Sequence, residues 1–192
     1  VFPTETRVQV ASIMTGCYPG RHGLVGNTFY LPGREPPWEV NAGDYRDISQ
    51  LNKETGGHAL HIETLGEILA GRGINMVSVS VGVSGSAMLH NHRAADVGGV
   101  IAHPEFTIPV AEQSNLEKRF GPWPEAGVPN SARMHHGTTI LLEHLIPAYR
   151  PAVATLWISE PDSAQHKTSI SSTQATEGIR QADAQLSRIL EH

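Results

Sequence analysis

The chain has 192 residues, a hydrophobic fraction of 39% and a formal net charge of −5. This length is sufficient for one well-buried core, so we expect a single domain. The negative charge gives no reason to bind a nucleic-acid polymer, and no apolar run approaches the ~18 residues of a membrane-spanning helix, so we expect a small-molecule partner. The single cysteine, Cys17, excludes an intrachain disulfide and leaves the location unknown.

The chain opens on a hydroxyl-bearing turn, Pro3-Thr4-Glu5-Thr6. The apolar positions between Arg7 and Thr15 favour a short buried helix closed by Gly16, although their β-branched content also allows a strand. The Thr6 hydroxyl could cap this helix, or it could attack phosphorus where backbone N–H groups stabilise an anion. Because Val1 is not an initiator methionine, we expect that a segment upstream has been removed.

Two long segments are predicted to run over the surface. Residues 28–57 are rich in Pro, Gly, Asn and Asp, and residues 98–129 form the second predicted loop. Such segments often shape binding sites. Tyr30, Trp38 and Trp123 lie in them and could stack on a ligand or pack within the fold.

Between and after these segments, helices and strands alternate. Helical spacing predicts a helix from 61 to 72, and alternation of valine with serine or glycine predicts a strand over 77–83. A helix over 140–146 should end at Pro147 or Pro151, and a strand should follow over 153–158. This alternation predicts an α/β sheet with helices on its faces and a ligand site beyond the carboxyl ends of its strands.

The last predicted helix is amphipathic, and its arginine and aspartate positions (Arg180, Asp183 and Arg188) should face water. Its apolar residues should share the buried face: Ile179, Ala182, Leu186, Ile189 and Leu190.

The segment from Glu160 to His166 directly follows the strand that ends near Ile158. It supplies a carboxylate, Asp162, and an imidazole, His166, four residues apart. This spacing suits two ligands of one metal ion, or a surface pair near a helix start.

The other histidines have weaker functional signals. His90 and His92 could face the site, or form hydrogen bonds at the surface, and the pair at 135–136 is expected to be structural or solvated. The glycine-containing run at 82–86 lacks the third glycine and the acidic residue of a dinucleotide-binding fingerprint.

Two groups of motifs carry a family resemblance. Residues 3–6, then Thr15-Gly16, Tyr18-Pro19 and the run His-Gly-Leu-Val-Gly-Asn at 22–27, resemble the nucleophile region of type I phosphodiesterase/nucleotide pyrophosphatases in the alkaline phosphatase superfamily. Glu160-Pro161-Asp162, followed by His166-Lys167, resembles that family's zinc-ligand segment. The resemblance implies a three-layer α/β/α sandwich with a mostly parallel central sheet, similar to alkaline phosphatase.

The resemblance also implies a role for each matched residue. Thr6 would be the nucleophile of a phospho-threonine intermediate and would touch one metal ion, while Asp162 and His166 would bind the other. The two divalent ions would be zinc, although manganese or iron accept the same donors. Asn27 would hydrogen-bond a phosphate oxygen, or simply form a Gly-Asn turn, and His22 would shape the neighbouring turn.

The chain departs from the family pattern in two respects. Arg7, Val8 and Gln9 follow Thr6, where the family has an aromatic residue, proline and asparagine. Arg7 could add positive charge near the phosphate and favour a monoester, or it could form a salt bridge elsewhere. In addition, the family's Asp before the nucleophile, its later Asp-His pair and a further His have no place here. We therefore expect residues 1–192 to be a partial catalytic domain that does not assemble a complete two-metal site alone.

Three functions remain open from the sequence. The first is a phosphodiesterase or nucleotide pyrophosphatase that acts on a small phosphate ester or nucleotide. The second is a phosphate monoester or phosphonate hydrolase of the same superfamily. The third is a non-catalytic truncated domain that binds a metal or a phosphate.

Overall fold

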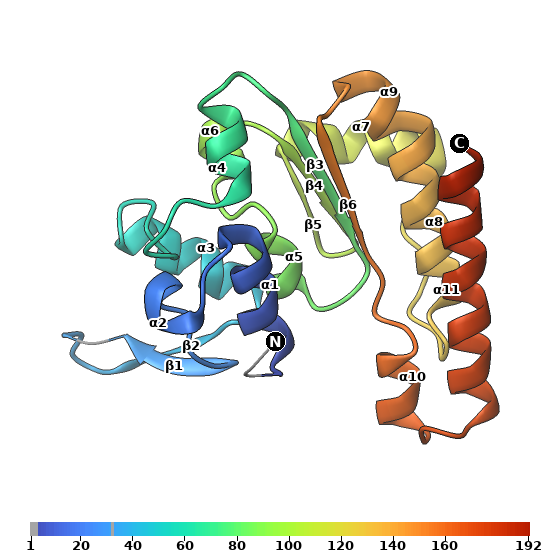
Figure 1. The fold of residues 1–192 in the computed structure, drawn as a ribbon, viewed down its shortest axis with the longest axis horizontal. Coiled ribbons are helices and arrows are strands. Elements are labelled where there is room, and N and C mark those ends of the chain that lie inside the picture. Colours follow the sequence, from blue (N-terminus) through green and yellow to red (C-terminus); the bar gives the residue numbers. More distant parts are fainter. Residues whose placement is uncertain (1–3, 32) are drawn as a thin grey trace.

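A four-stranded sheet separates two layers of helices in the computed structural model, which describes residues 4–31 and 33–192 (Figure 1). Pro3 of the opening motif lies outside the described residues. The sheet order is β5 (Phe106–Ile108), β4 (Val100–His103), β3 (Met76–Ser80) and β6 (Val153–Trp157). β3 pairs in parallel with β4 and β6, and only β5 runs antiparallel. The sheet is therefore mostly parallel, as predicted.

The two faces of β3 bury side chains against different helices. Val77 and Val79 pack in one cluster with Leu116 and with three residues of the α8–η1 segment, Ile140, Leu141 and Leu145. Met76 instead packs in a cluster with Val10 and other residues of the opposite layer. A strand that is buried on both faces must lie in the middle of the molecule. The predicted α/β/α arrangement is confirmed and is consistent with an alkaline-phosphatase-like fold.

The first layer contains six helices in the described part of the chain: α1 (Thr6–Thr15), α2 (Pro19–His22), α3 (Tyr45–Glu54), α4 (Leu65–Ala70), α5 (Ser84–Leu89) and α6 (Ala94–Val97). α1 ends where Gly16 adopts φ 65°, so the helix predicted here is correct and the alternative strand is not formed. α4 starts later than predicted because Thr64 and Glu67 form a capping box that fixes its first turn.

The second layer contains α7 (Val110–Phe120), α8 (Ser131–Ile140), a π-helical turn η1 (Leu141–Leu145), α9 (Ile146–Tyr149) and α11 (Thr173–Glu191). α10 (Asp162–Lys167) follows β6, extends beyond the sheet and packs against α11 (Figure 1). In the described part of the chain, no helix is long and apolar enough to cross a membrane.

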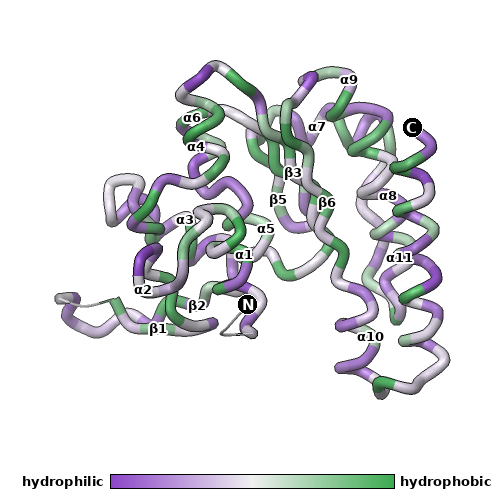
Figure 2. The backbone as a smooth tube through the Cα atoms, in the orientation of Figure 1, coloured by the Kyte–Doolittle hydropathy of each residue, from purple (hydrophilic) through white to green (hydrophobic). Residues whose placement is uncertain are grey.

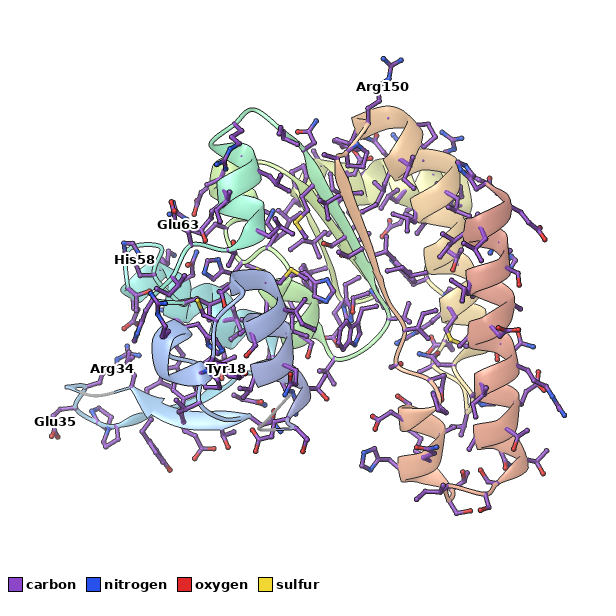
Figure 3. All side chains as sticks on the ribbon, in the orientation of Figure 1. Tyr18, Arg34, Glu35, His58, Glu63 and Arg150 are labelled. Atoms are coloured by element: carbon purple, nitrogen blue, oxygen red, sulfur yellow. The ribbon has the colours of Figure 1, made fainter. Side chains whose placement is uncertain are left out.

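Pro147 does not end the helix in which it lies, and the helix stops just before Pro151, the second of its two predicted ends. Proline has no N–H to donate to the carbonyl group four residues earlier, which belongs to Glu143. Arg119 of α7 instead donates from Nη2 to the Glu143 oxygen at 2.9 Å. The π-helical turn precedes Pro147, and the helix continues until Arg150, which has φ 44° and whose side chain points away from the molecule (Figure 3).

The two predicted surface excursions contain regular structure, so those predictions were wrong. Residues 28–57 form an antiparallel hairpin, β1 (Thr28–Leu31) with β2 (Trp38–Asn41), followed by α3. Arg34 and Glu35 lie at its tip (Figure 3). Residues 98–129 contain β4, β5 and α7. Strands of three or four residues between glycines and prolines are too short to show a periodic pattern, which is why sequence reasoning missed them.

The predicted buried face of α11 is also wrong. Ile179, Leu186 and Leu190 are exposed. The buried residues are instead small or polar: Ala175, Gly178 and Gln185. Small residues allow α11 to approach its neighbours closely, and Arg188, which was expected to face water, donates to Thr139 Oγ1 at 2.8 Å. Close packing of α11 on α8 therefore decides its orientation.

Candidate active site

A cavity of about 860 Å³ lies between the start of α1 and the segments that follow β3 and β6. The four residues predicted for the site all line it: Thr6, Asn27, Asp162 and His166. They come from three parts of the sequence that are separated by as many as 135 residues between Asn27 and Asp162. The fold thus brings the two motifs to one cavity.

The cavity lies beyond the carboxyl ends of two parallel strands. Past β3 and β6, the chain remains paired, because Val81 N–H donates to the Trp157 carbonyl at 3.1 Å and Ser159 Oγ donates to the Val81 carbonyl at 3.3 Å. Gly82, Val83 and Glu160 then line the cavity. This is the position that the α/β topology predicts for a ligand.

Thr6 is the first helical residue of α1 and is exposed. Glu5 occupies the N-cap position, and the first backbone hydrogen bond of the helix joins Gln9 N–H to the Glu5 carbonyl at 2.9 Å. Thr6 therefore does not cap the helix, and its hydroxyl has no hydrogen-bond partner among the described residues. The amide groups of this first turn have no acceptor within the helix and are available to an anion.

The backbone of Asn27 is fixed on both sides. Its N–H donates to Glu5 Oε2 and its carbonyl accepts from Ala42 N–H, each at 2.9 Å. The side-chain Oδ1 is buried and has no hydrogen-bond partner among the described residues. The amide is thus held beside the cavity without using its own hydrogen-bonding capacity. Sequence reasoning missed Glu5 as the residue that fixes this turn.

His22 is a structural residue, as predicted. Leu24 N–H donates to His22 Nδ1 at 3.2 Å, so Nε2 carries the proton and donates to Ser12 Oγ at 3.0 Å. The side chain is fully buried, and burial, together with the nearby His61, lowers its pKa. The adjacent Gly23 has φ 84°, and a Cβ there would lie within 3 Å of the His61 ring.

Asp162 and His166 lie side by side on α10. Asp162 Oδ1 and His166 Nε2 are 3.3 Å apart, and both side chains are about three-quarters exposed, at 74% and 79%. Figure 2 shows that α10 is hydrophilic. A carboxylate oxygen and an imidazole nitrogen suit zinc. Across residues 4–31 and 33–192, however, no group of three or more His, Cys, Asp or Glu residues could hold one ion.

Glu160 anchors the segment that carries these two residues. Its carboxylate is buried, with Oε1 accepting from Asn130 N–H at 2.9 Å and Oε2 from Ala164 N–H at 3.0 Å. Gly178 of α11 packs closely against it. Glu160 stood within the quoted motif, but only the structure reveals its anchoring role.

Arg7 lines the cavity next to Thr6 and forms no ion pair with any carboxylate in the described part of the chain. Of the two alternatives considered for Arg7, the salt bridge elsewhere is therefore not formed. The guanidinium lies against Gly43, where an added Cβ would be 2.7 Å from Nη2.

His90 and His92 neither lie at the surface nor line this cavity. Both are buried, and burial lowers the pKa of each to about 4. His90 Nδ1 lies 3.0 Å from Thr155 Oγ1. In α8, His136 packs on Trp123 and His135 contacts Arg188, which agrees with the structural alternative.

The three aromatic candidates for stacking have other contacts. The Tyr30 hydroxyl donates to Glu39 Oε2 at 2.8 Å, Trp38 packs in the core of the hairpin, and Trp123 packs against the second layer. None of the three lines the cavity around Thr6.

The layered sheet and its cavity define an α/β protein with a candidate ligand site at the carboxyl edge of parallel strands. A model of the type I phosphodiesterase/nucleotide pyrophosphatase family matches residues 1–192, the whole chain, and the chain belongs to this family. Membership implies hydrolase activity of the phosphodiesterase or pyrophosphatase type on small phosphate esters or nucleotides. A search among curated proteins found no match.

Proposed function

We propose that this protein hydrolyses phosphodiester or pyrophosphate bonds through a phospho-threonine intermediate on Thr6. The observation that carries this proposal is the convergence of Thr6, Asn27 and the Asp162–His166 pair on one cavity. These residues lie far apart in the sequence, and each has a side chain available to a ligand. A purely structural origin of the two motifs gives no reason for this convergence.

The start of α1 supplies groups for phosphoryl transfer. The Thr6 hydroxyl gives up its proton and its Oγ forms a bond to phosphorus as the bond from phosphorus to the leaving oxygen breaks, and the leaving oxygen takes up a proton. The free amides of the first turn and the Asn27 amide can donate to the phosphate oxygens. Water then attacks the phosphorus, and the Thr6 hydroxyl is released with phosphate or a phosphomonoester.

Asp162 and His166 are proposed to hold one of two divalent metal ions, for which zinc suits the donors best. The second ion would have the Thr6 hydroxyl among its ligands. A divalent ion supplies positive charge that lowers the pKa of a bound hydroxyl. Among the described residues, no third His, Cys, Asp or Glu joins Asp162 and His166. We therefore propose these two side chains as part of the ligand set of this ion.

The test is hydrolysis of a chromogenic phosphodiester by the full-length protein in the presence of zinc, comparing wild type with Thr6→Ala. Thr15→Ala is a matched control, since Thr15 lies at the other end of α1 and its hydroxyl donates to the Ala11 carbonyl. Loss of turnover in Thr6→Ala alone supports the proposal. Equal turnover in both variants removes Thr6 from the mechanism. Zinc binding without turnover in the wild type indicates a non-catalytic domain.

A further inference from the structure

Three polar atoms around the candidate site are buried and have no hydrogen-bond partner among the described residues: Arg7 Nε, Asn27 Oδ1 and Ser86 Oγ. The residues that carry them all line the Thr6 cavity. A buried polar atom without a partner costs about 1–3 kcal/mol. Arg7 Nε and Ser86 Oγ can each donate to an anionic ligand, whereas Asn27 Oδ1 can only accept. Arg7, which the sequence allowed to add positive charge near the phosphate, and Ser86 have no part in the phosphoryl transfer proposed above.

Arg7 brings a full positive charge to this cavity. Glu5, two residues before Arg7, accepts a hydrogen bond from Asn27 N–H. No carboxylate in the described part of the chain forms an ion pair with the Arg7 guanidinium. A guanidinium remains charged at any physiological pH and matches two phosphate oxygens at once. An unpaired guanidinium in a half-buried position therefore favours an anion.

Helix α5, which carries Ser86, and the Arg7 guanidinium both approach Gly43. Gly85 N–H donates to the Gly43 carbonyl at 2.9 Å, and the Arg7 guanidinium lies against the same Gly43. Ser86 follows Gly85 directly and is fully buried. A hydroxyl can donate to an anion without adding charge, so Ser86 complements the guanidinium.

We propose that Arg7 and Ser86 form a subsite for extra negative charge beside the phosphorus that Thr6 attacks. The preferred substrates then carry a second negative charge there, on the same phosphorus as in a monoester or on a neighbouring phosphate as in a pyrophosphate linkage. Singly charged diesters lack this charge. The preference rests on the proposed function, but the subsite itself is a binding property and can be measured without turnover.

The experiment measures dissociation constants by calorimetry for three probes: phenyl phosphate, inorganic pyrophosphate and dimethyl phosphate. The first two carry more than one negative charge, and the third carries one. Wild type should bind a multiply charged probe at least about tenfold more tightly than dimethyl phosphate. Tighter binding of phenyl phosphate than of pyrophosphate would place the second charge on the same phosphorus, and the reverse order would place it on a neighbouring phosphate.

Arg7→Gln should remove that preference, Arg7→Lys should retain part of it, and Ser86→Ala should weaken it several-fold. Arg21→Gln is the matched control, because Arg21 lies on α2 and does not line the cavity.

Circular dichroism establishes that each variant is folded. If Arg7→Gln does not fold, the comparison is made with Arg7→Lys and Ser86→Ala. The subsite is refuted if wild type binds no multiply charged probe or shows no preference, or if the folded variants bind like wild type. Binding that depends on Arg7, without turnover that depends on Thr6, would refute the proposed function alone.

Discussion

Glu5 and Asn27 are joined by a hydrogen bond from the Asn27 backbone N–H to Glu5 Oε2, at 2.9 Å. Glu5 immediately precedes Thr6, so this contact fixes the position of Asn27 relative to the start of α1. Neither residue is part of the hydrophobic core. Because the contact is exposed, we expect it to serve the geometry of the candidate site more than the stability of the fold.

Replacement of Glu5 should consequently affect activity more than folding. We expect Glu5→Gln, whose amide oxygen is a weaker acceptor, to lower kcat/KM several-fold, and Glu5→Ala to lower it about tenfold or more. The midpoint of thermal unfolding should stay within a few degrees of wild type, since the bond is exposed. Steady-state kinetics with parallel melting curves provide the check. A large fall in the melting temperature with unchanged kinetics would contradict this role.

Glu160→Ala should destabilise the protein by about 1–3 kcal/mol, because two buried backbone N–H groups lose their acceptor. Urea unfolding measures this change. Glu54→Ala on α3 is a suitable control, because Glu54 pairs with Arg34 at the surface and such pairs contribute little. An unfolding free energy of Glu160→Ala equal to that of the control would mean that the two N–H groups find other acceptors.

Asp162→Asn and His166→Ala should weaken zinc binding while leaving the unfolding transition of the metal-free protein unchanged. Their side chains are mostly exposed, so their mutual contact adds little to stability. Calorimetric titration with zinc, starting from chelator-treated protein, is the measurement. His135→Ala serves as a control for the loss of an exposed histidine. Unaltered zinc affinity in both site variants would place the metal elsewhere.

Stability should fall as the pH is lowered from about 6.5 to about 4. Burial lowers the pKa of His90 to about 4, whereas in the unfolded chain the pKa is near 6.5. In this interval the unfolded state binds more protons, so stability is fully present above pH 6.5 and is lost toward pH 4, by up to about 3 kcal/mol from His90. Urea unfolding across this range should show a shallower slope in His90→Leu. An unchanged slope would indicate that His90 titrates normally.

Gly85→Ala should be strongly destabilising, because the added Cβ would lie 2.1 Å from the Ala42 carbonyl oxygen. Backbone atoms cannot move aside as a flexible side chain can, so we expect a loss of about 3 kcal/mol or more. Gly20→Ala in α2 is the control, since nothing lies within 4 Å of its added Cβ. Thermal unfolding compares the two. Similar melting temperatures would show that α5 can shift away from Ala42.

The sequence predicted elements with strong local signals. The valine alternation of β3 and the glycine that closes α1 identified these elements correctly because both signals depend on neighbouring residues. β4 was missed, since four buried residues between a pair of glycines and a proline show no period. The orientation of α11 was wrong because it depends on how closely two helices can approach, which is a property of the packed molecule.

In the candidate site too, features encoded by neighbouring residues could be predicted, and features that depend on distant contacts could not. The Thr6 and Asp162 motifs could be singled out from the sequence, because each is a short run of neighbouring residues that resembles a motif of the family. Ser86 and the anchoring role of Glu160 could not be predicted, because their significance comes from contacts with residues far away in sequence. Hydrogen bonds and buried unpaired atoms become visible only after the chain has folded.

The buried carboxylate of Glu160 joins the start of α8 to the segment that carries Asp162 and His166. We expect both of its hydrogen bonds, from the amides of Asn130 and Ala164, to open together when this segment is displaced. These two amide hydrogens should exchange with solvent deuterium at similar, slow rates, although 34 positions separate them in the chain. Similar rates would place the candidate metal ligands in one cooperative unit with the second helical layer.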